Sequence, residues 1–125
     1  MALFAEGDAS AADYMAMLRD RTALVQAMDA GLSDLDALVL PTTPIVAPTI
    51  AEVSSSEGFT ANNGLALRNP AIANMLDRCA ISMPCHRRGD APVGLMLVGE
   101  HGADRRLFAI AAAVEQIVSP ELDKS

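Results

Sequence analysis

The chain has 125 residues, of which 51% are hydrophobic but only 3% aromatic, and its formal net charge is −7. This length suffices for one domain with its own core and is too short for two, so we expect a single domain over residues 1–125. The acidic balance argues against nucleic acid, whose phosphates require basic side chains, and against an anionic membrane surface. Neither a membrane span nor a signal peptide is recognisable. We therefore expect a soluble, cytoplasmic protein with no nucleic-acid or membrane partner.

A long helix is predicted from Ser10 to Gly31. Ser10 and Asp13 form the pattern of a capping box, and Gly31 suits the position that follows a helix. Arg21 interrupts the apolar face, where we expect it to extend to solvent or to make a contact. Residues 1–9 are expected to be flexible. The apolar residues that recur at helical spacing are Tyr14, Met17, Leu18, Leu24, Val25 and Met28.

The middle of the chain is predicted to hold a short strand, a long loop and a short helix. Residues 37–40 are continuously apolar, and Pro41 ends the run. Residues 41–60 contain three prolines and no periodicity, which predicts a loop because proline disfavours helix at the residue before it. Asn62, Asn63 and Gly64 indicate a turn, and Pro70 suits the first turn of a short helix over residues 71–78.

The last third of the chain is predicted to form two strands and a helix. Apolar runs at 80–83 and 93–98 flank a polar segment, which indicates buried strands joined by a turn. Their continuous apolar character favours a sheet covered on both faces. A helix is expected over residues 104–118, followed by a flexible tail at 119–125. Its buried stripe is predicted to be Leu107, Ile110, Ala111, Val114 and Ile117.

Cysteine and histidine side chains are candidates for catalytic or metal-binding groups. Cys79 and Cys85 flank one predicted strand, where their Cα atoms would lie ~20 Å apart, too far for a disulfide. Only His86 and His101 are available to complete a metal site, so neither metal nor cofactor is expected. Because neighbours on a strand point to opposite faces, a packed or semi-exposed Cys85 thiol is favoured over a Cys85–His86 nucleophile pair.

Other suggestive residues have simpler interpretations. Ser54, Ser55 and Ser56 lack a neighbouring base and are interpreted as loop residues, while Arg88-Gly89-Asp90 is typical of a turn. His101 lies in a predicted turn and is expected to cap it or to be solvated. No phosphate-binding or dinucleotide-binding motif occurs.

Several segments, in order, match a known pattern. Tyr14 and Arg21 occupy the first helix; residues 36–44 read DALVLPTTP; Asn74 precedes AISMPC at 80–85; residues 91–99 read APVGLMLVG. This ordered set, continued by Asp104, Leu107, Ala111 and Glu115 in the closing helix, resembles the C-terminal part of amidase-signature hydrolases over roughly residues 10–118. The sequence departs from that family at 77–79, where Gly-Leu-Pro is common, and at His86, where glycine is common.

The resemblance implies an α/β fold: a partial mixed sheet with flanking helices, in the order helix, strand, long loop, short helix, strand, strand, helix. It also implies hydrolysis of a carboxamide C–N bond by a Ser–cis-Ser–Lys triad, whose lysine must be held neutral at low dielectric. The single lysine here, Lys124, stands in the tail, and no Gly/Ser-rich segment is present. We therefore assign no catalytic residue, expect the catalytic N-terminal part to be absent, and expect the chain alone to be inactive.

The resemblance also suggests where a substrate would bind. Substrate contacts are expected at Thr42, Arg68, Asn69 and Asn74, with Arg68 meeting either a substrate carboxylate or a structural ion-pair partner. Expected partners are a small-molecule amide in the full-length enzyme, and the missing N-terminal half or a second copy of the chain. Two alternatives remain open: a non-catalytic interaction or scaffold domain diverged from amidases, and a Cys85-dependent hydrolase.

Overall fold

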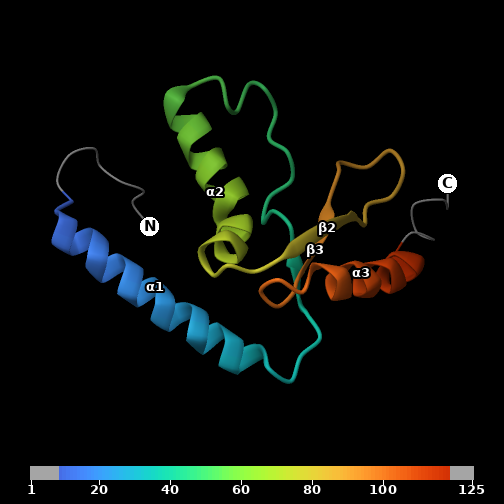
Figure 1. The fold of residues 1–125 in the computed structure, drawn as a ribbon. Coiled ribbons are helices and arrows are strands. Elements are labelled where there is room, and N and C mark those ends of the chain that lie inside the picture. Colours follow the sequence, from blue (N-terminus) through green and yellow to red (C-terminus); the bar gives the residue numbers. More distant parts are fainter. Residues whose placement is uncertain (1–8, 119–125) are drawn as a thin grey trace.

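A computed structural model describes residues 9–118, so the flexible ends predicted at 1–9 and 119–125 lie, apart from Ala9, outside the described residues. The elements confirm an α/β fold with the expected order of helices and strands (Figure 1). They are α1 (Ala11–Leu32), β1 (Leu38–Pro41), α2 (Ser56–Met75), β2 (Ala80–Pro84), β3 (Gly94–Val98) and α3 (Asp104–Val118).

The strands form one three-stranded sheet in the order β1-β3-β2, with β3 in the centre. Both pairs are antiparallel, so the described strands do not show the parallel pairing that a mixed sheet would include. Met96 of β3 lies opposite Leu40 of β1 on one side and Ser82 of β2 on the other. The β2–β3 connection is the hairpin turn that the polar segment predicted.

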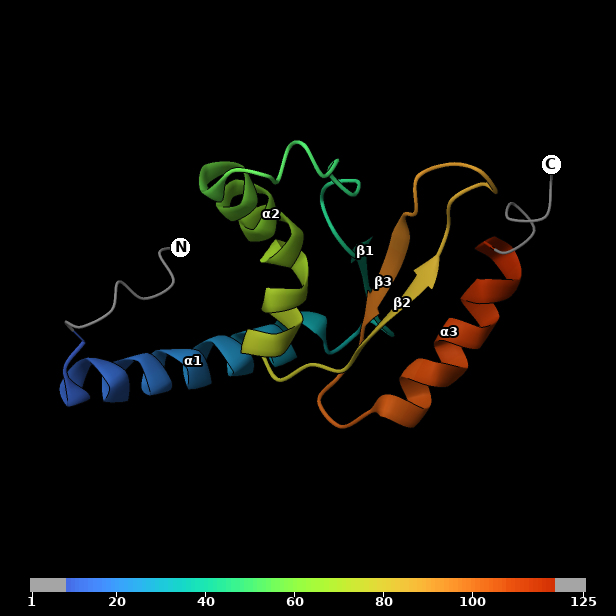
Figure 2. The same ribbon diagram turned by 90° about the horizontal axis from the view of Figure 1, so that it is seen from above.

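The central strand is covered on both faces, as its continuous apolar sequence predicted. Leu97, which is 1% exposed, packs with Met83 beneath Leu107 and Ala111 of α3. On the opposite face, Met96 and Val98 pack with Ala73 of α2. Figure 2 shows α2 and α3 on either side of the sheet. The result is a helix–sheet–helix arrangement with β3 at its core.

The predicted stripe of α3 is correct except at its end. Leu107 and Ala111 are buried and Ile110 and Val114 pack partly against the core, but Ile117 is 75% exposed. The reason is length: the 15-residue helix extends ~22 Å, whereas five-residue strands extend ~17 Å. The last turn of α3 therefore passes the edge of the sheet.

The prediction of a short helix over 71–78 was wrong. α2 begins at Ser56 and runs through the expected turn at 62–64 and through Pro70 to Met75. The loop after β1 accordingly occupies residues 42–55 rather than 41–60. Tertiary packing outweighs the local cost of proline and glycine inside this helix.

Both ends of α2 have local causes. The Ser55 hydroxyl caps the start by accepting a hydrogen bond from the Gly58 N–H at 3.0 Å. The end comes before Arg78 because Asp77 adopts a φ of +53°, which a right-handed helix does not allow.

The first helix confirms the predicted capping box. The Asp13 N–H donates to Ser10 Oγ at 3.2 Å, and the Ser10 N–H donates to Asp13 Oδ2 at 2.9 Å. At its other end the helix continues through Gly31 to Leu32, and Ser33 is its C-terminal cap. Gly31 is therefore an interior helix residue and not the residue that follows the helix.

The apolar face of α1 is only partly covered by the described chain, because Val25 and Met28 are half-buried and the rest of the face is exposed. No α1 residue is buried, and Tyr14, Met17, Leu18 and Leu24 are between 42% and 57% exposed. Figures 1 and 2 both show α1 projecting away from the sheet. Arg21 makes a contact, which was one of its two expected roles: its Nη2 lies 2.7 Å from Asp77 Oδ1.

Candidate functional site

A polar cluster, defined as Thr42, Ser82 and Asn69 together with the neighbouring Arg68, lies at the end of β1. The Thr42 N–H donates to the Gly94 carbonyl at 2.8 Å, which places the first loop residue against β3. The Thr42 and Ser82 hydroxyls are hydrogen-bonded to each other across β3. A Cβ on Gly94 would lie 2.5 Å from Ser82 Oγ and 2.6 Å from Thr42 Oγ1, so only glycine allows the two hydroxyls to meet.

Asn69 joins α2 to this cluster. Its side chain is on the buried face of the helix, and its Nδ2 donates to the Pro41 carbonyl at 2.8 Å. The Arg68 Nε lies 3.5 Å from Asn69 Oδ1, and Arg68 is otherwise exposed. The structure therefore brings Thr42, Arg68 and Asn69 together.

Asn74, the fourth predicted substrate residue, lies elsewhere on α2. It is exposed in the last turn, where its carbonyl accepts the Asp77 N–H at 3.3 Å. No hydrogen bond joins it to the polar cluster among residues 9–118. Ser82 and Gly94, by contrast, were not selected from the sequence. Ser82 was recognisable as the single hydroxyl in the apolar run 80–83.

The chemistry available in the polar cluster is hydrogen bonding. Hydroxyls, an amide and a guanidinium can recognise a carboxylate or an amide, but they include no base that would activate a nucleophile. Within residues 9–118, no group of three His, Cys, Asp or Glu side chains is arranged to hold a metal ion. None of the helices in this part of the chain is long and apolar enough to cross a membrane.

Cys85 and His86 do not point to opposite faces as predicted. Cys85 Sγ lies 3.6 Å from the Val93 carbonyl oxygen, and His86 Nδ1 lies 3.3 Å from both the N and O atoms of Val93. β2 ends at Pro84, so the alternation of a strand no longer applies to these two residues. No hydrogen bond links the thiol to the imidazole in the described chain. The Cys85 and His86 side chains both contact Val93 at the turn end of the β2–β3 hairpin. Cys79 and Cys85 are both free thiols.

The remaining candidates have structural roles. Ser55 caps α2, and Ser54 Oγ donates to the Ala51 carbonyl at 2.8 Å. His101 Nδ1 lies 2.7 Å from the Asp77 carbonyl oxygen; because a carbonyl only accepts, this nitrogen carries the proton. The turn at 88–90 is confirmed by Gly89, whose φ is +94°.

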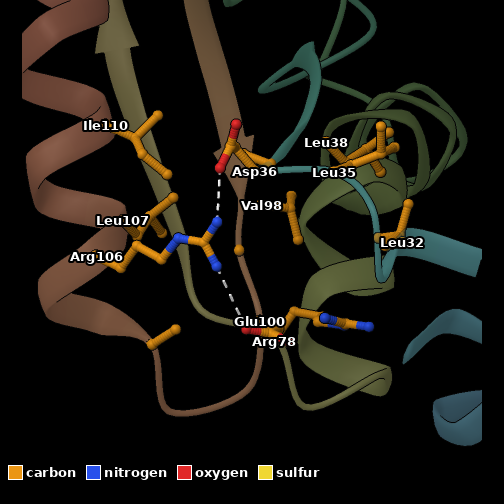
Figure 3. A pocket seen from close by; sticks show the side chains of 13 residues that line it. Leu32, Leu35, Asp36, Leu38, Arg78, Val98, Glu100, Arg106, Leu107 and Ile110 are labelled. Carbon is orange, nitrogen blue, oxygen red and sulfur yellow. Dashed lines mark hydrogen bonds and ion pairs between the residues drawn. The ribbon is translucent and has the colours of Figure 1, made fainter. Parts of the chain in front are cut away.

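A small pocket, lined mostly by apolar residues together with a few charged side chains, lies between the α1–β1 connection and α3 (Figure 3). There Arg106 Nη2 lies 2.6 Å from Asp36 Oδ1, and Arg106 Nη1 lies 3.8 Å from Glu100 Oε2. Arg78 also lines this region, but its guanidinium turns away from Arg106 toward α1. The enclosed space of about 10 Å³ admits roughly one water molecule and no substrate.

The described residues form an α/β segment in which hydrogen-bonded hydroxyl and amide side chains, with an exposed guanidinium beside them, lie at the end of β1. Comparison with known proteins identifies the family: the family model described as Amidase matches residues 2–108. The chain belongs to the amidase family.

Individual relatives agree with this assignment. The chain is 36% identical over 103 residues to 2-amino-5-chloromuconic acid deaminase of Comamonas testosteroni. This alignment covers 78% of this chain and 22% of that protein. It is 32% identical over 111 residues to a fatty acid amide hydrolase of Medicago truncatula, covering 86% of this chain and 18% of that protein. The chain thus spans about a fifth of the length of these relatives.

Two solved structures share the fold. A glutamyl-tRNA(Gln) amidotransferase subunit from Thermotoga maritima matches with a TM-score of 0.67 and 29% identity, covering 82% of this chain and 22% of that one. An allophanate hydrolase from Kluyveromyces lactis matches with a TM-score of 0.75 and 26% identity, covering 93% of this chain and 20% of that one.

Proposed function

We propose that these residues form part of an amidase that hydrolyses a carboxamide C–N bond, and that they supply one wall of its substrate pocket. The observation that carries this proposal is the polar cluster at the end of β1. There, Thr42, Ser82 and Asn69 are positioned by hydrogen bonds to one another or to strand backbone. Groups held in this way recognise a polar substrate at low entropic cost.

The nucleophile and base of the reaction belong, in this proposal, to the longer protein. The mechanism implied by the resemblance requires a buried lysine and a Gly/Ser-rich segment. These 125 residues contain a single lysine, Lys124, and no Gly/Ser-rich segment. The aligned segments make up only about a fifth of the length of these relatives. The chain alone is therefore expected to be catalytically silent.

Substrate recognition is proposed for Thr42, Arg68, Asn69 and Asn74. Arg68 is the best candidate for a carboxylate of the substrate, because its guanidinium is exposed next to the polar cluster and has no carboxylate partner among residues 9–118. Asn69 supports the pocket from behind through its bond to Pro41. The name of the Comamonas testosteroni relative, which refers to a carboxylic acid, is compatible with such a substrate.

The apolar surface of the helices supports a large partner. Exposed side chains on α1 and α2 include Leu24 at 53%, Phe59 at 57% and Leu67 at 50%. Exposed apolar surface beyond a few hundred Å² marks an interaction site. We propose that the remainder of the amidase covers it; a second copy of the chain, or the partner of a scaffold domain, would be the alternative.

The test uses the purified 125-residue chain and a chimera in which this chain replaces the matching segment of the Comamonas testosteroni deaminase. Ammonia release from the deaminase substrate is measured for both, with circular dichroism as a control for folding. We expect no turnover by the chain above a heat-killed control, and turnover by the chimera. Activity of the chain alone would refute its silence, and a folded but inactive chimera would favour the scaffold alternative.

A further inference from the structure

The β2–β3 connection, residues 85–93, extends from the end of the sheet at which the polar cluster lies. Pro84 of β2 pairs with Gly94 of β3, and the Thr42 N–H donates to the Gly94 carbonyl. Figures 1 and 2 show this connection and the loop after β1 leaving the same end of the sheet. The connection therefore starts beside the polar cluster.

Hydrogen bonds hold the connection in a defined shape at both of its ends. At the sheet, the Val93 N–H donates to His86 Nδ1 at 3.3 Å. At the tip, the Asp90 N–H donates to the Arg87 carbonyl at 3.1 Å, and Gly89 has a φ of +94°. This combination is typical of a type II turn, whose third residue requires a positive φ.

The tip of the connection presents two free guanidinium groups. Arg87 and Arg88 take the first two positions of the turn, and both are exposed. Neither makes an ion pair with Asp90 or with any other carboxylate among residues 9–118. Arg68, beside the polar cluster, is a third arginine at this end of the sheet without a carboxylate partner in the described chain. Three cations therefore remain available there for an anion.

The two ends of the sheet differ in charge. The connections at 33–37, 76–79 and 99–103, at one end, carry four carboxylates and one arginine. Those at 42–55 and 85–93, at the other end, carry two carboxylates and two arginines. Arg68 adds a further positive charge to this second end, in a chain whose net charge is −7. An anion is therefore repelled least at the end that holds the polar cluster.

We propose that Arg87 and Arg88 attract a substrate that carries a carboxylate in addition to its amide, and guide it to the polar cluster, where Arg68 binds the carboxylate. This inference rests on the proposed function and adds to it the residues that steer the substrate. Arg87 follows Pro84 by three residues, so its backbone lies at most ~10 Å beyond the end of β2. This is about one Debye length at about 0.1 M salt, so the field of the arginines extends to the polar cluster.

A small anion fits this surface better than a polyanion does. Two neighbouring arginines can neutralise only about two phosphates, and binding to nucleic acid grows with the number of phosphates contacted. Anionic lipid surfaces are recognised by clusters of about four to eight basic residues. Binding of a polyanion in place of a small carboxylate is therefore an outcome that the test must separate.

Steady-state kinetics of the chimera test the steering. The double variant Arg87→Gln/Arg88→Gln is compared with Arg19→Gln/Arg105→Gln, which removes the same charge from two exposed arginines without ion pairs in the described chain. The substrate is the acid that the name of the deaminase gives. Circular dichroism checks the folding of both variants.

We expect the Arg87→Gln/Arg88→Gln variant to lower kcat/KM by about three- to tenfold at low ionic strength, with kcat unchanged. The difference from wild type should disappear above about 0.3 M salt, because screening shortens the Debye length. The control variant should retain the wild-type kcat/KM. An equal loss in both variants, no loss in either, or a loss that persists at high salt would overturn the steering and leave the proposed function standing.

The isolated chain supplies a readout that is independent of turnover. Succinate and its neutral diamide are titrated against the ¹⁵N-labelled chain, and the side-chain Nε–H signals of the arginines are followed by NMR. We expect succinate to shift the signals of Arg68, Arg87 and Arg88 but not those of Arg19 and Arg105, and the diamide to shift none. Such shifts alongside an inactive chimera would overturn the proposed function and retain the anion site. Equal shifts at all five arginines, or shifts with an oligonucleotide but not with succinate, would overturn the inference.

Discussion

Arg78 Nη2 lies 2.6 Å from Asp29 Oδ1, and this ion pair ties the end of α1 to the connection between α2 and β2. The Arg78 side chain is 1% exposed, whereas that of Asp29 is 52% exposed. Arg21 and Asp77 make a second pair between the same two segments. Since no residue of α1 is fully buried and only a few apolar side chains, most of them near its C-terminal end, are half-buried, these polar contacts add to weak apolar packing.

The first prediction concerns this buried guanidinium. Arg78→Met should lower the free energy of unfolding by about 1.5–3 kcal/mol, because a charged hydrogen bond to Asp29 is lost. Arg106→Met is the control: Arg106 and Asp36 are 2.6 Å apart, but their side chains are 55% and 79% exposed. Exposed pairs contribute about 1 kcal/mol or less. Urea denaturation followed by circular dichroism measures both; equal losses would contradict the role of Arg78.

The second prediction concerns the glycine beneath the two hydroxyls. Gly94→Ala should destabilise the chain by about 1–3 kcal/mol, because the new methyl group meets both Ser82 Oγ and Thr42 Oγ1. Adding Ser82→Ala should recover part of this loss, since contacting residues are not additive. A full double-mutant cycle by urea denaturation measures the coupling.

Gly64→Ala provides the matched control for Gly94. Gly64 lies inside α2, and an added Cβ would have no atom within 4 Å. We expect stabilisation by about 0.5–1 kcal/mol, because alanine loses less conformational freedom in a helix than glycine does. Destabilisation at Gly64 would indicate that α2 does not extend through this residue.

The third prediction concerns the pH dependence of the start of α1. Hydrogen bonds from the side chain and then the backbone of Ser10 lower the pKa of the Asp13 carboxyl from its ordinary value. A folded-state pKa below the unfolded one means that the stabilisation is present above about pH 4. It is lost as the pH falls through the lower, folded-state value.

Asp13→Asn should therefore make the stability of the start of α1 less dependent on pH in the acidic range. The chemical shifts of the Ser10 and Asp13 amides, followed by NMR between pH 2 and 6, report the titration of the Asp13 carboxyl. In the wild-type chain the midpoint of this titration should lie at a lower pH than the midpoint for aspartate in an unfolded peptide. A midpoint above that of the peptide would show that the Ser10 contacts do not favour the ionised carboxyl. Glu52, whose pKa is lowered by the backbone and side chain of Thr49, should behave in the same way.

The fourth prediction separates support from recognition within the polar cluster. Asn69→Leu should destabilise the chain by about 1–3 kcal/mol, because the Pro41 carbonyl loses its partner. Arg68→Gln should leave stability within about 0.5 kcal/mol, since its side chain is exposed. In the active chimera, Arg68→Gln should raise KM with little change in kcat. An unchanged KM would contradict a recognition role for Arg68.

Local interactions explain what could be predicted without tertiary structure. The capping box at Ser10 and Asp13 joins residues three apart, and the strands at 80–84 and 94–98 are marked by their own apolar runs and flanking turns. The free thiols followed from the reach of an extended strand. The ordered motifs were sufficient for the family, because each motif is contained in a short segment.

Long-range contacts decided the rest. α2 continues through Gly64 and Pro70 because its Asn69 and Ala73 face the sheet, a gain that no local rule contains. The Thr42 and Ser82 hydroxyls are separated by 40 residues and meet only because β1 and β2 flank the side-chain-free Gly94. Sequence by itself therefore determined the class of fold, the family and the local caps. Only the tertiary structure decided which polar side chains meet, because that depends on the order in which the strands pair.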